Sequence, residues 1–396
     1  MRVLILTKIF PNSVEPLSSP FNRRQFHELA RLCDVEVLAT IPWFPGAKAF
    51  ARWSPAGRLF DVPKEERIAG LTVRHPRFVF LPKIGPGLSG PLYAASLATT
   101  ALEYRGKVDV VLGSWAYPDG FAAVVLGEML GIPAVIKLHG SDMNVVARLP
   151  GPRRGLKWAL PRAARVVAVS RPLRDAAIEF GAPPSRIDVV PNGIDRAHFR
   201  PLDRMAARRA LGLRTEGTVI VYVGNIEHHK GAVDLVHAFA AVARLRDDVA
   251  LVMVGDGAAR NECQKLAVDL GVDVSFVGAK PHDEVPRWIG ACDVFALPSW
   301  NEGTPNVVLE ALACGRRVVA TRVGGTPDVV TSDALGMLVP PRDIQALAHA
   351  LAQALSTPYE PEAVSAGLDA PDWQGSAERL HASLLMAVES RVSRAA

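Results

Sequence analysis

Cysteine, metal-ligand clusters and long apolar runs are all scarce in this chain of 396 residues. Its four cysteines include no C-x-x-C pair, which excludes a cysteine-based zinc or dithiol redox motif. No D-x-D triplet occurs, and no group of His, Cys and Asp has the spacing of metal ligands. The segment Gly255-Asp256-Gly257 lacks the third glycine of a dinucleotide fingerprint, which argues against NAD binding. We therefore expect neither a metal nor an organic cofactor.

The apolar stretches are too short or too interrupted to span a bilayer. The longest, residues 121–138, contains Glu128, Pro133 and Lys137, whereas a membrane-spanning helix needs about 20 mostly apolar residues. The run Met1–Thr7 is shorter than the apolar region of a signal peptide and is typical of a buried first strand. A cytoplasmic protein is therefore expected.

Charge is divided unevenly along the chain. Residues 1–200 hold 27 Lys and Arg against 16 Asp and Glu, and residues 201–396 hold 18 against 24. Such asymmetry favours an anionic partner for the first half, with nucleic acid, an anionic membrane and a pyrophosphate-bearing substrate as candidates. Basic residues on solvated faces would give the same totals, so charge by itself does not choose among these partners.

Strand and helix patterns alternate through both halves of the chain. Short apolar runs, each typical of a buried parallel strand, are separated by amphipathic helical faces. These runs lie at residues 3–7, 35–39, 108–112, 134–138, 166–169, 219–223, 250–254, 274–277, 294–297, 317–320 and 337–339. The alternation predicts an α/β fold with two Rossmann-like domains. Between residues 42 and 90 the pattern breaks down, and there we expect a short strand or two and long surface loops.

The turn-rich segment Val190–Asp195 marks the predicted domain boundary. We assign residues 1–190 to an N-terminal domain and residues 191–373 to a C-terminal domain. Ligands of open parallel sheets bind outside the carboxyl ends of the strands. We therefore expect the two domains to face each other across a cleft, with the chemistry carried by the loops that follow the strands.

The most informative loop runs from Pro298 to Gly315, directly after the strand at 294–297. Thr304 can cap a helix, and Pro305 suits the first helical position. Gly303 permits close approach of a ligand to the backbone. The amides of Asn306 and Val307 would then point at an anion held by the start of the helix.

Two glutamates, Glu302 and Glu310, accompany this helix start. Glu310 lies one turn below Asn306 on the same helix face, where a carboxylate can accept hydrogen bonds from sugar hydroxyls. Glu302, in the loop ahead of the helix, is expected nearer the reacting sugar. Two glutamates eight residues apart are common by chance. The preceding strand and the Gly-Thr-Pro-Asn between them favour a functional site over two solvated surface residues.

Together these segments resemble retaining glycosyltransferases of the GT-B fold, of the large family-four type, in which two glutamates have E-x7-E spacing. The resemblance covers nearly the whole chain. It rests on the ordered segments Phe10-Pro11, Asn22–Gln25, Lys137–Asp142, Pro191–Asp195, Val223-Gly224, Lys230-Gly231, Val254–Gly257, Glu302–Glu310, Ala313–Gly315 and Val323–Pro327. It also implies that the final segment, about residues 374–396, is a helix that returns to the N-terminal domain.

The resemblance implies a role for each position. Glu302 would contact the transferred sugar, and Glu310 would bind the ribose of the nucleotide. Lys230 would neutralise the diphosphate, and His139 would reach the donor sugar or line the acceptor side. The segment that holds sugar and phosphate would comprise Gly303, Thr304, Pro305, Asn306 and Val307. Ser141 and Asp142 would lie on the acceptor side, where Asp142 either orients its neighbours or caps a helix.

Simple electrostatics supports two of these assignments. Transfer from a nucleotide sugar builds negative charge on the leaving phosphate, which a fixed cation and helix-end amides stabilise. Lys230 follows the strand at 219–223, and His139 ends the strand at 134–138, so both are expected at the cleft. A solvated lysine and a structural histidine are the alternatives.

Two departures from the family pattern concern the donor side. Many relatives carry an arginine at the position of Asn225, where it pairs with the phosphates; His228 or His229 would have to compensate here. Many relatives also carry glycine in the loop after the first strand. Here that loop reads Leu17-Ser18-Ser19-Pro20, and Pro20 has no amide to donate.

The expected activity is retaining transfer from a UDP- or GDP-sugar to a glycan or a lipid-pyrophosphate-linked acceptor, as in polysaccharide biosynthesis. The departing phosphate can take the acceptor proton, whereas a double displacement would need Glu302 as nucleophile. Closure of the two domains would assemble the site. Nucleic acid is not an expected partner.

Basic and aromatic residues within 42–83 favour peripheral contact with an anionic membrane on the cytoplasmic face. A solvated loop region is the alternative to that membrane contact. Two other functions stay open as well: a GT-B-fold sugar-nucleotide epimerase, and a catalytically inactive nucleotide-sugar-binding protein. The second is motivated by Asn225 and Ser18-Ser19.

Overall fold

The computed structural model describes residues 1–16, 18–51, 53–80 and 88–395, and the chain divides into two compact units. Unit 1 comprises Met1–Gly193 and Trp373–Ala396, and unit 2 comprises Ile194–Asp372. The predicted boundary lay three residues earlier, between residues 190 and 191. No helix in the described ranges is long and apolar enough to cross a bilayer.

Unit 1 is built on a large twisted sheet with the strand order β10-β9-β8-β7-β1-β2-β5-β4, in which only β4 runs antiparallel to its neighbour. Its strands are β1 (Arg2–Thr7), β2 (Asp34–Ala39), β4 (Glu65–Ile68), β5 (Leu71–Arg74), β7 (Val110–Ser114), β8 (Ala134–Leu138), β9 (Arg165–Ala168) and β10 (Ile187–Val189). A separate pair consists of β3 (Ile41–Trp43) and β6 (Arg77–Val79). The α-helices are α1 (Pro20–Leu29), α2 (Pro55–Arg58), α3 (Ser89–Leu102), α4 (Phe121–Leu130), α5 (Ser141–Asn144), α6 (Pro150–Ala159), α7 (Arg171–Glu179) and α16 (Trp373–Ala395).

The alternating side chains of the unit 1 strands form two separate cores. Leu4, Leu6 and Ile136 point to one face, where α3, α4 and α6 cover them. Val3, Ile5 and neighbouring residues point to the other face, against α1 and α16. Successive residues of a strand face opposite sides of the sheet, so a strand buried on both faces reads as a continuous apolar run.

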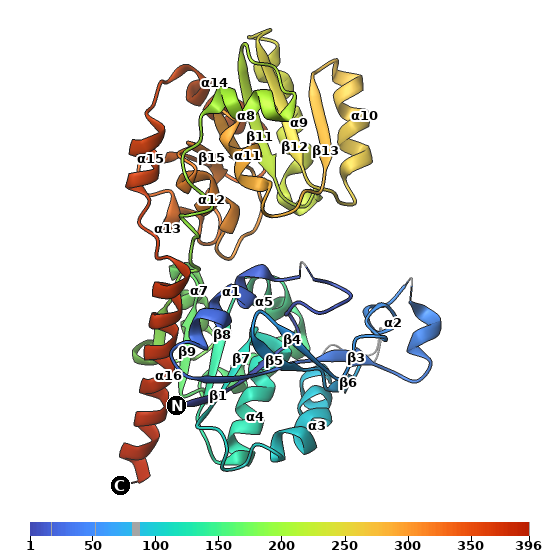
Figure 1. Ribbon diagram of the computed structural model, residues 1–396, viewed down its shortest axis with the longest axis vertical. Coiled ribbons are helices and arrows are strands. Elements are labelled where there is room, and N and C mark those ends of the chain that lie inside the picture. The colour runs from blue at the N-terminus through green and yellow to red at the C-terminus, as the bar shows by residue number, and fades with distance from the viewer. Residues whose placement is uncertain (17, 52, 81–87, 396) are drawn as a thin grey trace. The chain divides into compact units, whose positions relative to one another are not determined.

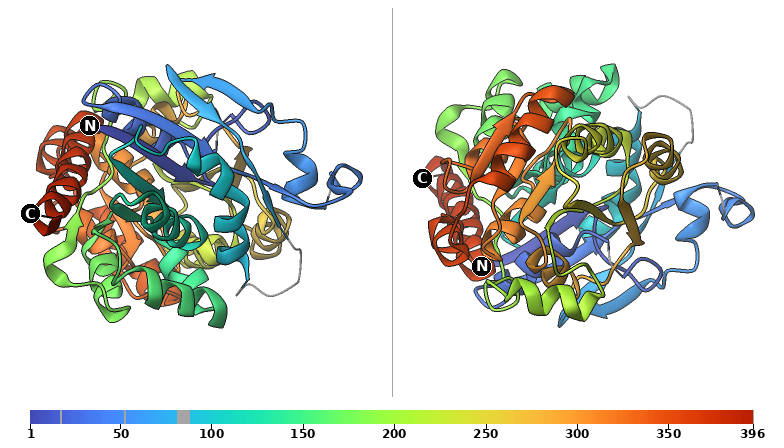
Figure 2. Two further views of the ribbon diagram at one scale, coloured as in Figure 1. Left: turned by 90° about the horizontal axis from the view of Figure 1, so that it is seen from below. Right: turned by 90° about the horizontal axis from the view of Figure 1, so that it is seen from above.

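The C-terminal helix α16 completes unit 1. Its residues Ala377, Leu380, Leu384 and Ala387 join the core that contains Val3 and Ile5 of β1. In Figures 1 and 2 this red helix lies beside the N-terminus of the chain. Gln25 Nε2 of α1 also donates to Ser376 Oγ of α16 at 2.8 Å. The last segment of the sequence therefore closes the sheet that the first segment begins.

The stretch from residue 42 to 90 is more ordered than its sequence indicates. It contains β4, β5, β6, α2 and the start of α3, rather than a short strand or two. In β5, Leu71 and Val73 are buried and alternate with the more exposed Thr72 and Arg74, so this strand lies at the border of the core. A run of only four residues is too short to be distinguished from loop by its pattern.

Unit 2 is a six-stranded parallel sheet with the order β13-β12-β11-β14-β15-β16 around a single apolar core. Its strands are β11 (Thr218–Val223), β12 (Val249–Val254), β13 (Val274–Gly278), β14 (Val294–Leu297), β15 (Val318–Thr321) and β16 (Gly336–Val339). Its helices are α8 (Arg204–Leu211), α9 (Ala232–Ala243), α10 (Arg260–Leu270), α11 (Val285–Gly290), α12 (Asn306–Ala313), α13 (Thr326–Val329), α14 (Ile344–Ser356) and α15 (Pro361–Gly367). Every strand predicted in either half of the sequence is present, with ends displaced by at most two residues.

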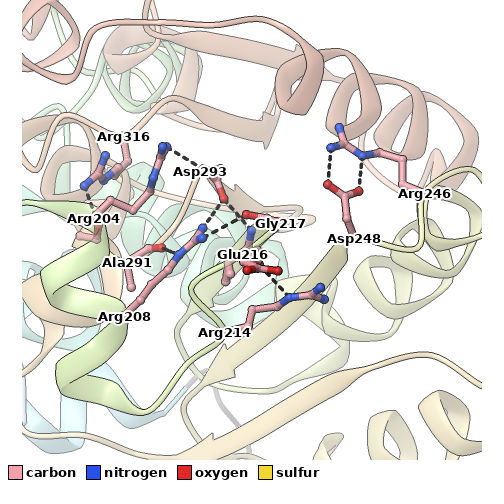
Figure 3. A network of polar contacts seen from close by, with 12 residues as sticks. Arg204, Arg208, Arg214, Glu216, Gly217, Arg246, Asp248, Ala291, Asp293 and Arg316 are labelled. Atoms are coloured by element: carbon pink, nitrogen blue, oxygen red, sulfur yellow. Dashed lines mark hydrogen bonds and ion pairs between the residues drawn. The ribbon is translucent and has the colours of Figure 1, made fainter.

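A buried ionic network holds α8 to the amino edge of this sheet (Figure 3). Asp293, just before β14, accepts from Arg204 Nη1 at 2.7 Å, from the Val219 amide at 2.6 Å and from Arg208 Nη2. Arg208 is 1% exposed and also donates to the carbonyl of Ala291 at 2.9 Å. Asp293 therefore supplies the counter-charge for a guanidinium group that water cannot reach.

We predict that Asp293→Ala lowers the free energy of unfolding by about 3–5 kcal/mol, because removing one partner leaves the buried charge of Arg208 uncompensated. Urea unfolding measures the change. Asp248→Ala is the matched control, since Asp248 binds the more exposed Arg246 in the same region and its loss should cost less than about 1 kcal/mol. Equal losses in the two variants would contradict this account.

Candidate functional site

The strand order of unit 2 reverses direction between β11 and β14. The loops after these two strands therefore lead to opposite sides of the sheet, and this is where open parallel sheets bind their ligands. Lys230 ends a 3-10 turn in the loop after β11, and Glu302 lies in the loop after β14. Two of the residues singled out in the sequence thus meet at the switch point of the sheet.

Lys230 and Glu302 form an ion pair. Lys230 Nζ lies 2.8 Å from Glu302 Oε1, although the two residues are 72 positions apart in the sequence. The side chain of Glu302 is 10% exposed and that of Lys230 is 26% exposed. The pair keeps both groups partly accessible to a ligand while each neutralises the other.

Two glycines allow the loops around this ion pair to pack closely. Gly231 has φ 69°, and a β-carbon there would lie 2.0 Å from the carbonyl oxygen of Pro298. Gly324 has φ 49°, and a β-carbon there would lie 1.8 Å from the carbonyl oxygen of Glu302. A side chain at either position would push the loops apart, so these glycines fix the backbone beside Lys230 and Glu302.

Helix α12 begins one residue later than the sequence predicts. Pro305, rather than Thr304, is its N-cap, and Asn306 is its first residue. Pro305 itself makes no side-chain capping hydrogen bond. The start of a helix directs backbone N–H groups and the positive end of the helix dipole toward the preceding loop, which suits an anion.

Glu310 lies on the face of α12 opposite its buried residues Leu309 and Leu312. Its partner is His282, which was not singled out in the sequence: His282 Nε2 donates to Glu310 Oε1 at 3.2 Å. His198 stacks on the His282 ring at 5.9 Å and donates to the His282 carbonyl at 3.3 Å. His282 therefore links the loop after β13 to the carboxylate on α12, and nothing in the local sequence reveals that link.

Asn225 lies in the loop after β11 with its side chain exposed. Its carbonyl oxygen accepts a hydrogen bond from the Tyr222 hydroxyl at 2.6 Å, so its backbone is held in place. His228 pairs with Glu262 of α10 at 3.1 Å, with both side chains more than half exposed. An added positive charge beside Lys230 is therefore not supplied by His228 in this arrangement.

His139 lies at the carboxyl edge of unit 1, directly after β8. Its Nε2 is 3.0 Å from Ser114 Oγ, which itself donates to Asn22 Oδ1 at 3.3 Å. When Ser114 gives its proton to Asn22, Nε2 of His139 is the donor and Nδ1 keeps the lone pair. Burial lowers the pKa of His139 well below its usual value, so the ring is neutral.

Aromatic side chains that the sequence did not single out enclose His139. The ring of Trp115 stacks on it at 6.0 Å, and the ring of Phe21 lies 5.2 Å away at a tilt. Lys8 Nζ lies 5.3 Å from the Trp115 ring centroid. Trp115 directly follows β7 and Lys8 directly follows β1, so their strand-end positions were the signal that could have revealed them.

Asp142 supports the His139 loop from within. Its carboxylate is fully buried and accepts from the backbone amides of Ala116, His139, Gly140 and Met143 at 2.7–3.2 Å. Of its two predicted roles, this geometry fits the orienting one, through the backbone. Ser141, the neighbouring residue, is exposed at the start of α5.

Two buried titratable groups lie near this edge. Lys137 is fully buried in β8, where its Nζ donates to Gln25 Oε1, and burial lowers its pKa to about 7. Asp119 is also fully buried, accepts from the Tyr93 hydroxyl, and has its pKa raised by burial to about 7. Neither residue was identified from the sequence as part of a site.

Some of the basic residues within 42–83 have protein partners, whereas Lys64 and Arg67 are exposed. Arg77 donates to the carbonyls of Leu59, Phe60 and Val62 at 2.6–3.1 Å. Arg58 pairs with Glu15, and Arg74 pairs with Glu103. The aromatic side chains of Trp53 and Phe50 are exposed as well, at 80% and 47%. Lys83, the last of these basic residues, lies outside the described residues.

Among the described residues no group of three His, Cys, Asp or Glu side chains is placed to hold a metal ion. The absence of a metal and of an organic cofactor stays a prediction.

Two family models match the chain, one in each half. Residues 22–198 match Glycosyltransferase Family 4, and residues 203–367 match Glycosyl transferases group 1. Among curated proteins the chain is 31% identical over 371 residues to TuaC of Bacillus subtilis (strain 168), a glycosyltransferase named for teichuronic acid biosynthesis. That match covers 92% of this chain and 90% of TuaC. A 2-deoxystreptamine glucosyltransferase of Streptomyces kanamyceticus is 32% identical over 69% of this chain and 75% of its own length.

Solved structures share the fold at lower identity. Anabaena HepE in complex with UDP superposes with a TM-score of 0.67 at 20% identity, over 100% of this chain and 99% of HepE. The same protein has been solved with UDP-glucose. Sucrose-phosphate synthase from Thermosynechococcus elongatus gives a TM-score of 0.68 at 19% identity, over 100% of this chain and 98% of that one.

The buried lysine generates a prediction on pH and stability. Because the pKa of Lys137 falls from 10.5 to about 7 on folding, the unfolded chain binds more protons between these values, and stability rises with pH across that window. In Lys137→Met this contribution should disappear. Urea unfolding from pH 7 to pH 10 should therefore show the wild type gaining stability relative to Lys137→Met.

Lys157→Met serves as the control, because Lys157 is exposed on α6 and its loss should leave the pH dependence of the wild type intact. Parallel stability curves for wild type and Lys137→Met would show that the amine of Lys137 is not desolvated.

Proposed function

Because the chain belongs to the glycosyltransferases of the GT-B fold, we propose that it transfers a sugar, with retention of configuration, from a nucleoside diphosphate sugar. The acceptor is a glycan or a lipid-pyrophosphate-linked sugar of polysaccharide biosynthesis. The observation that carries the proposal is the Lys230–Glu302 ion pair at the switch point of unit 2, one loop ahead of the helix that carries Glu310.

The donor binds at the carboxyl edge of unit 2. Its diphosphate lies at the start of α12 and against Lys230, and its ribose hydroxyls are bound by Glu310. This placement is supported by the position of both groups beside the reversal of strand order. A UDP-sugar is the favoured donor, because the structurally similar HepE has been solved with UDP and with UDP-glucose. A GDP-sugar is the other nucleotide donor that we propose.

Transfer breaks the bond between the anomeric carbon and the diphosphate oxygen and forms a bond from that carbon to the acceptor oxygen. Negative charge grows on the departing diphosphate, where Lys230 and the α12 amides stabilise it. The acceptor attacks from the face that the diphosphate leaves, and a phosphate oxygen takes the acceptor proton. Glu302 holds Lys230 in position and contacts the transferred sugar.

Unit 1 holds the acceptor at its own carboxyl edge, where the neutral His139 is fixed by Ser114 and by the aromatic rings of Trp115 and Phe21. Aromatic faces suit the apolar faces of sugar rings, and the lone pair on Nδ1 can accept a hydroxyl proton in a hydrogen bond. The exposed Phe50 and Trp53 support contact with a membrane that presents a lipid-linked acceptor.

The activity is tested by incubating the protein with a panel of UDP- and GDP-sugars, with and without lipid-pyrophosphate-linked acceptors. We expect a glycosylated acceptor whose new linkage has the anomeric configuration of the donor, as measured by NMR. An isomerised nucleotide sugar formed without acceptor would instead indicate an epimerase. Donor binding without turnover on any acceptor would indicate an inactive binding protein.

The ribose assignment predicts the order of two variants in nucleotide affinity. Glu310→Ala should raise the Kd for UDP about 10- to 100-fold, because hydrogen bonds to a charged group contribute about 1.5–3 kcal/mol. His282→Ala should raise it about three- to tenfold, because it removes one hydrogen bond that orients Glu310. Isothermal titration calorimetry measures both, and His228→Ala is the control. Unchanged affinity in Glu310→Ala would exclude the ribose role.

The variant Glu302→Gln distinguishes the two mechanisms that retain the anomeric configuration, which are attack from the leaving-group face and double displacement through Glu302. The amide keeps the shape of the side chain but cannot act as a nucleophile, so attack from the leaving-group face predicts that substantial turnover survives. Single-turnover transfer measured at saturating donor is the readout. A loss of several orders of magnitude with unchanged UDP affinity would favour a covalent intermediate on Glu302.

A further inference from the structure

A cavity of about 280 Å³ at the amino edge of the unit 1 sheet collects basic side chains. Its charged lining residues, among the described residues, are Arg162, Arg165, Arg186, Arg391 and Glu128. The cavity lies where β8 and β9 begin, because Ala134 and Arg165 are the first residues of these strands. His139 follows the other end of β8, about 16 Å away at the usual rise of a strand. The cavity is therefore separate from the candidate catalytic edge.

Two of the four guanidinium groups already have partners. Arg165 is held by both carboxylate oxygens of Asp188, at 2.7 and 2.6 Å. Arg162 lies 4.9 Å from the ring centroid of Trp158 and donates to the Trp158 carbonyl at 3.0 Å. The guanidinium groups of Arg186 and Arg391, by contrast, make no hydrogen bond or ion pair to any residue that the structure describes.

Arg391 lies beside the C-terminal end of α4. Gly131 ends α4 with φ 68°, and a β-carbon there would lie 3.8 Å from Arg391 Nη2. The carbonyls at the end of α4 already accept from the amides of Gly131 and Ile132, at 3.2 and 2.9 Å. Arg391 is exposed, and Glu128 of the same helix lines the cavity without an ion pair to Arg391 among the described residues.

A second cavity, of about 620 Å³, adjoins the first. Both are lined by Gly131, Ile132, Pro133 and Arg391, so Arg391 stands between them. The combined space is within the range of small-molecule sites. The first cavity is lined by apolar residues such as Val124, Ile132 and Ala387 as well as by the arginines.

We propose that this cavity is a second ligand site of the protein, which binds a phosphoryl group between Arg186 and Arg391. Four guanidinium groups outnumber the carboxylates of Glu128 and Asp188 around this cavity, and the excess positive charge favours a multivalent anion. The planar fork of arginine matches two oxygens of a phosphate, which favours phosphate over a single-charge anion. The ligand connects α16, through Arg391, to the start of β10, through Arg186, and thereby stabilises unit 1.

The test uses inorganic pyrophosphate and the full chain. With the predicted donor site filled by saturating UDP, calorimetry should detect pyrophosphate binding to the wild type. In Arg186→Ala/Arg391→Ala the Kd for pyrophosphate should rise at least tenfold, while the Kd for UDP stays within twofold of the wild type. The matched control is Arg154→Ala/Lys157→Ala, which removes two exposed charges of unit 1 outside the cavity and should bind pyrophosphate as the wild type does.

A vesicle assay distinguishes a free phosphorylated metabolite from a lipid headgroup. Co-sedimentation is measured with phosphatidylcholine vesicles with and without phosphatidylglycerol. If the wild type binds the anionic vesicles and not pyrophosphate, and Arg186→Ala/Arg391→Ala loses that binding, the phosphoryl group is that of a lipid.

Two results would overturn the proposal. One is a wild type that binds neither pyrophosphate nor anionic vesicles. The other is equal binding by the wild type and Arg186→Ala/Arg391→Ala, which would place the anion elsewhere. Both readouts are independent of sugar transfer, so they stand whether or not the proposed glycosyltransferase activity is found; if UDP itself does not bind, the pyrophosphate comparison is made without it.

Discussion

The parallel direction of the strands is the constraint that determines at which edge of each sheet the loops of this protein lie. In the two large sheets only β4 runs antiparallel, so successive strands deliver their following loops to one edge and their preceding loops to the other. Where the strand order reverses, at β1/β7 in unit 1 and at β11/β14 in unit 2, loops from distant parts of the sequence meet. The ion pair between Lys230 and Glu302 exists because of this reversal, which brings together residues 72 positions apart.

The same geometry separates two kinds of polar chemistry. At the carboxyl edges, Lys230 with Glu302 and His282 with Glu310 stay partly accessible, and the partly exposed His139 binds the buried Ser114. At the amino edge of unit 2, Asp293 neutralises the buried guanidinium group of Arg208 and so contributes to stability. The amino edge of unit 1 departs from that pattern, since Arg186 and Arg391 line a cavity there without described partners. This difference between the two amino edges is what motivates a second ligand site.

The chemistry of both carboxyl edges depends less on which residues are exposed than on the neighbouring side chains that hold those residues in position. The carboxylate of Asp142 accepts hydrogen bonds from four backbone amides and thereby fixes the loop that carries His139. Ser114 and Asn22 decide which nitrogen of His139 carries the proton. In unit 2, Gly324 lets the loop after β15 touch the backbone of Glu302. The contacts of Asp142 with Ala116, of Ser114 with His139 and of Gly324 with Glu302 join separate segments, so they depend on the assembled sheet.

The sequence by itself determined the two α/β domains, the strands of both sheets outside residues 42–90 and β10, and the family to which the chain belongs. Buried parallel strands are continuous apolar runs, and the glutamates at 302 and 310 lie in one local strand-loop-helix segment, so both signals are local. Only the tertiary structure decided that β4 and β5 complete the sheet, that Lys230 pairs with Glu302, that His282 holds Glu310, and that Asp142 is buried. These features depend on contacts between side chains of separate strands, helices and loops. The order of apolar and polar residues along the sequence does not indicate which of these side chains come into contact.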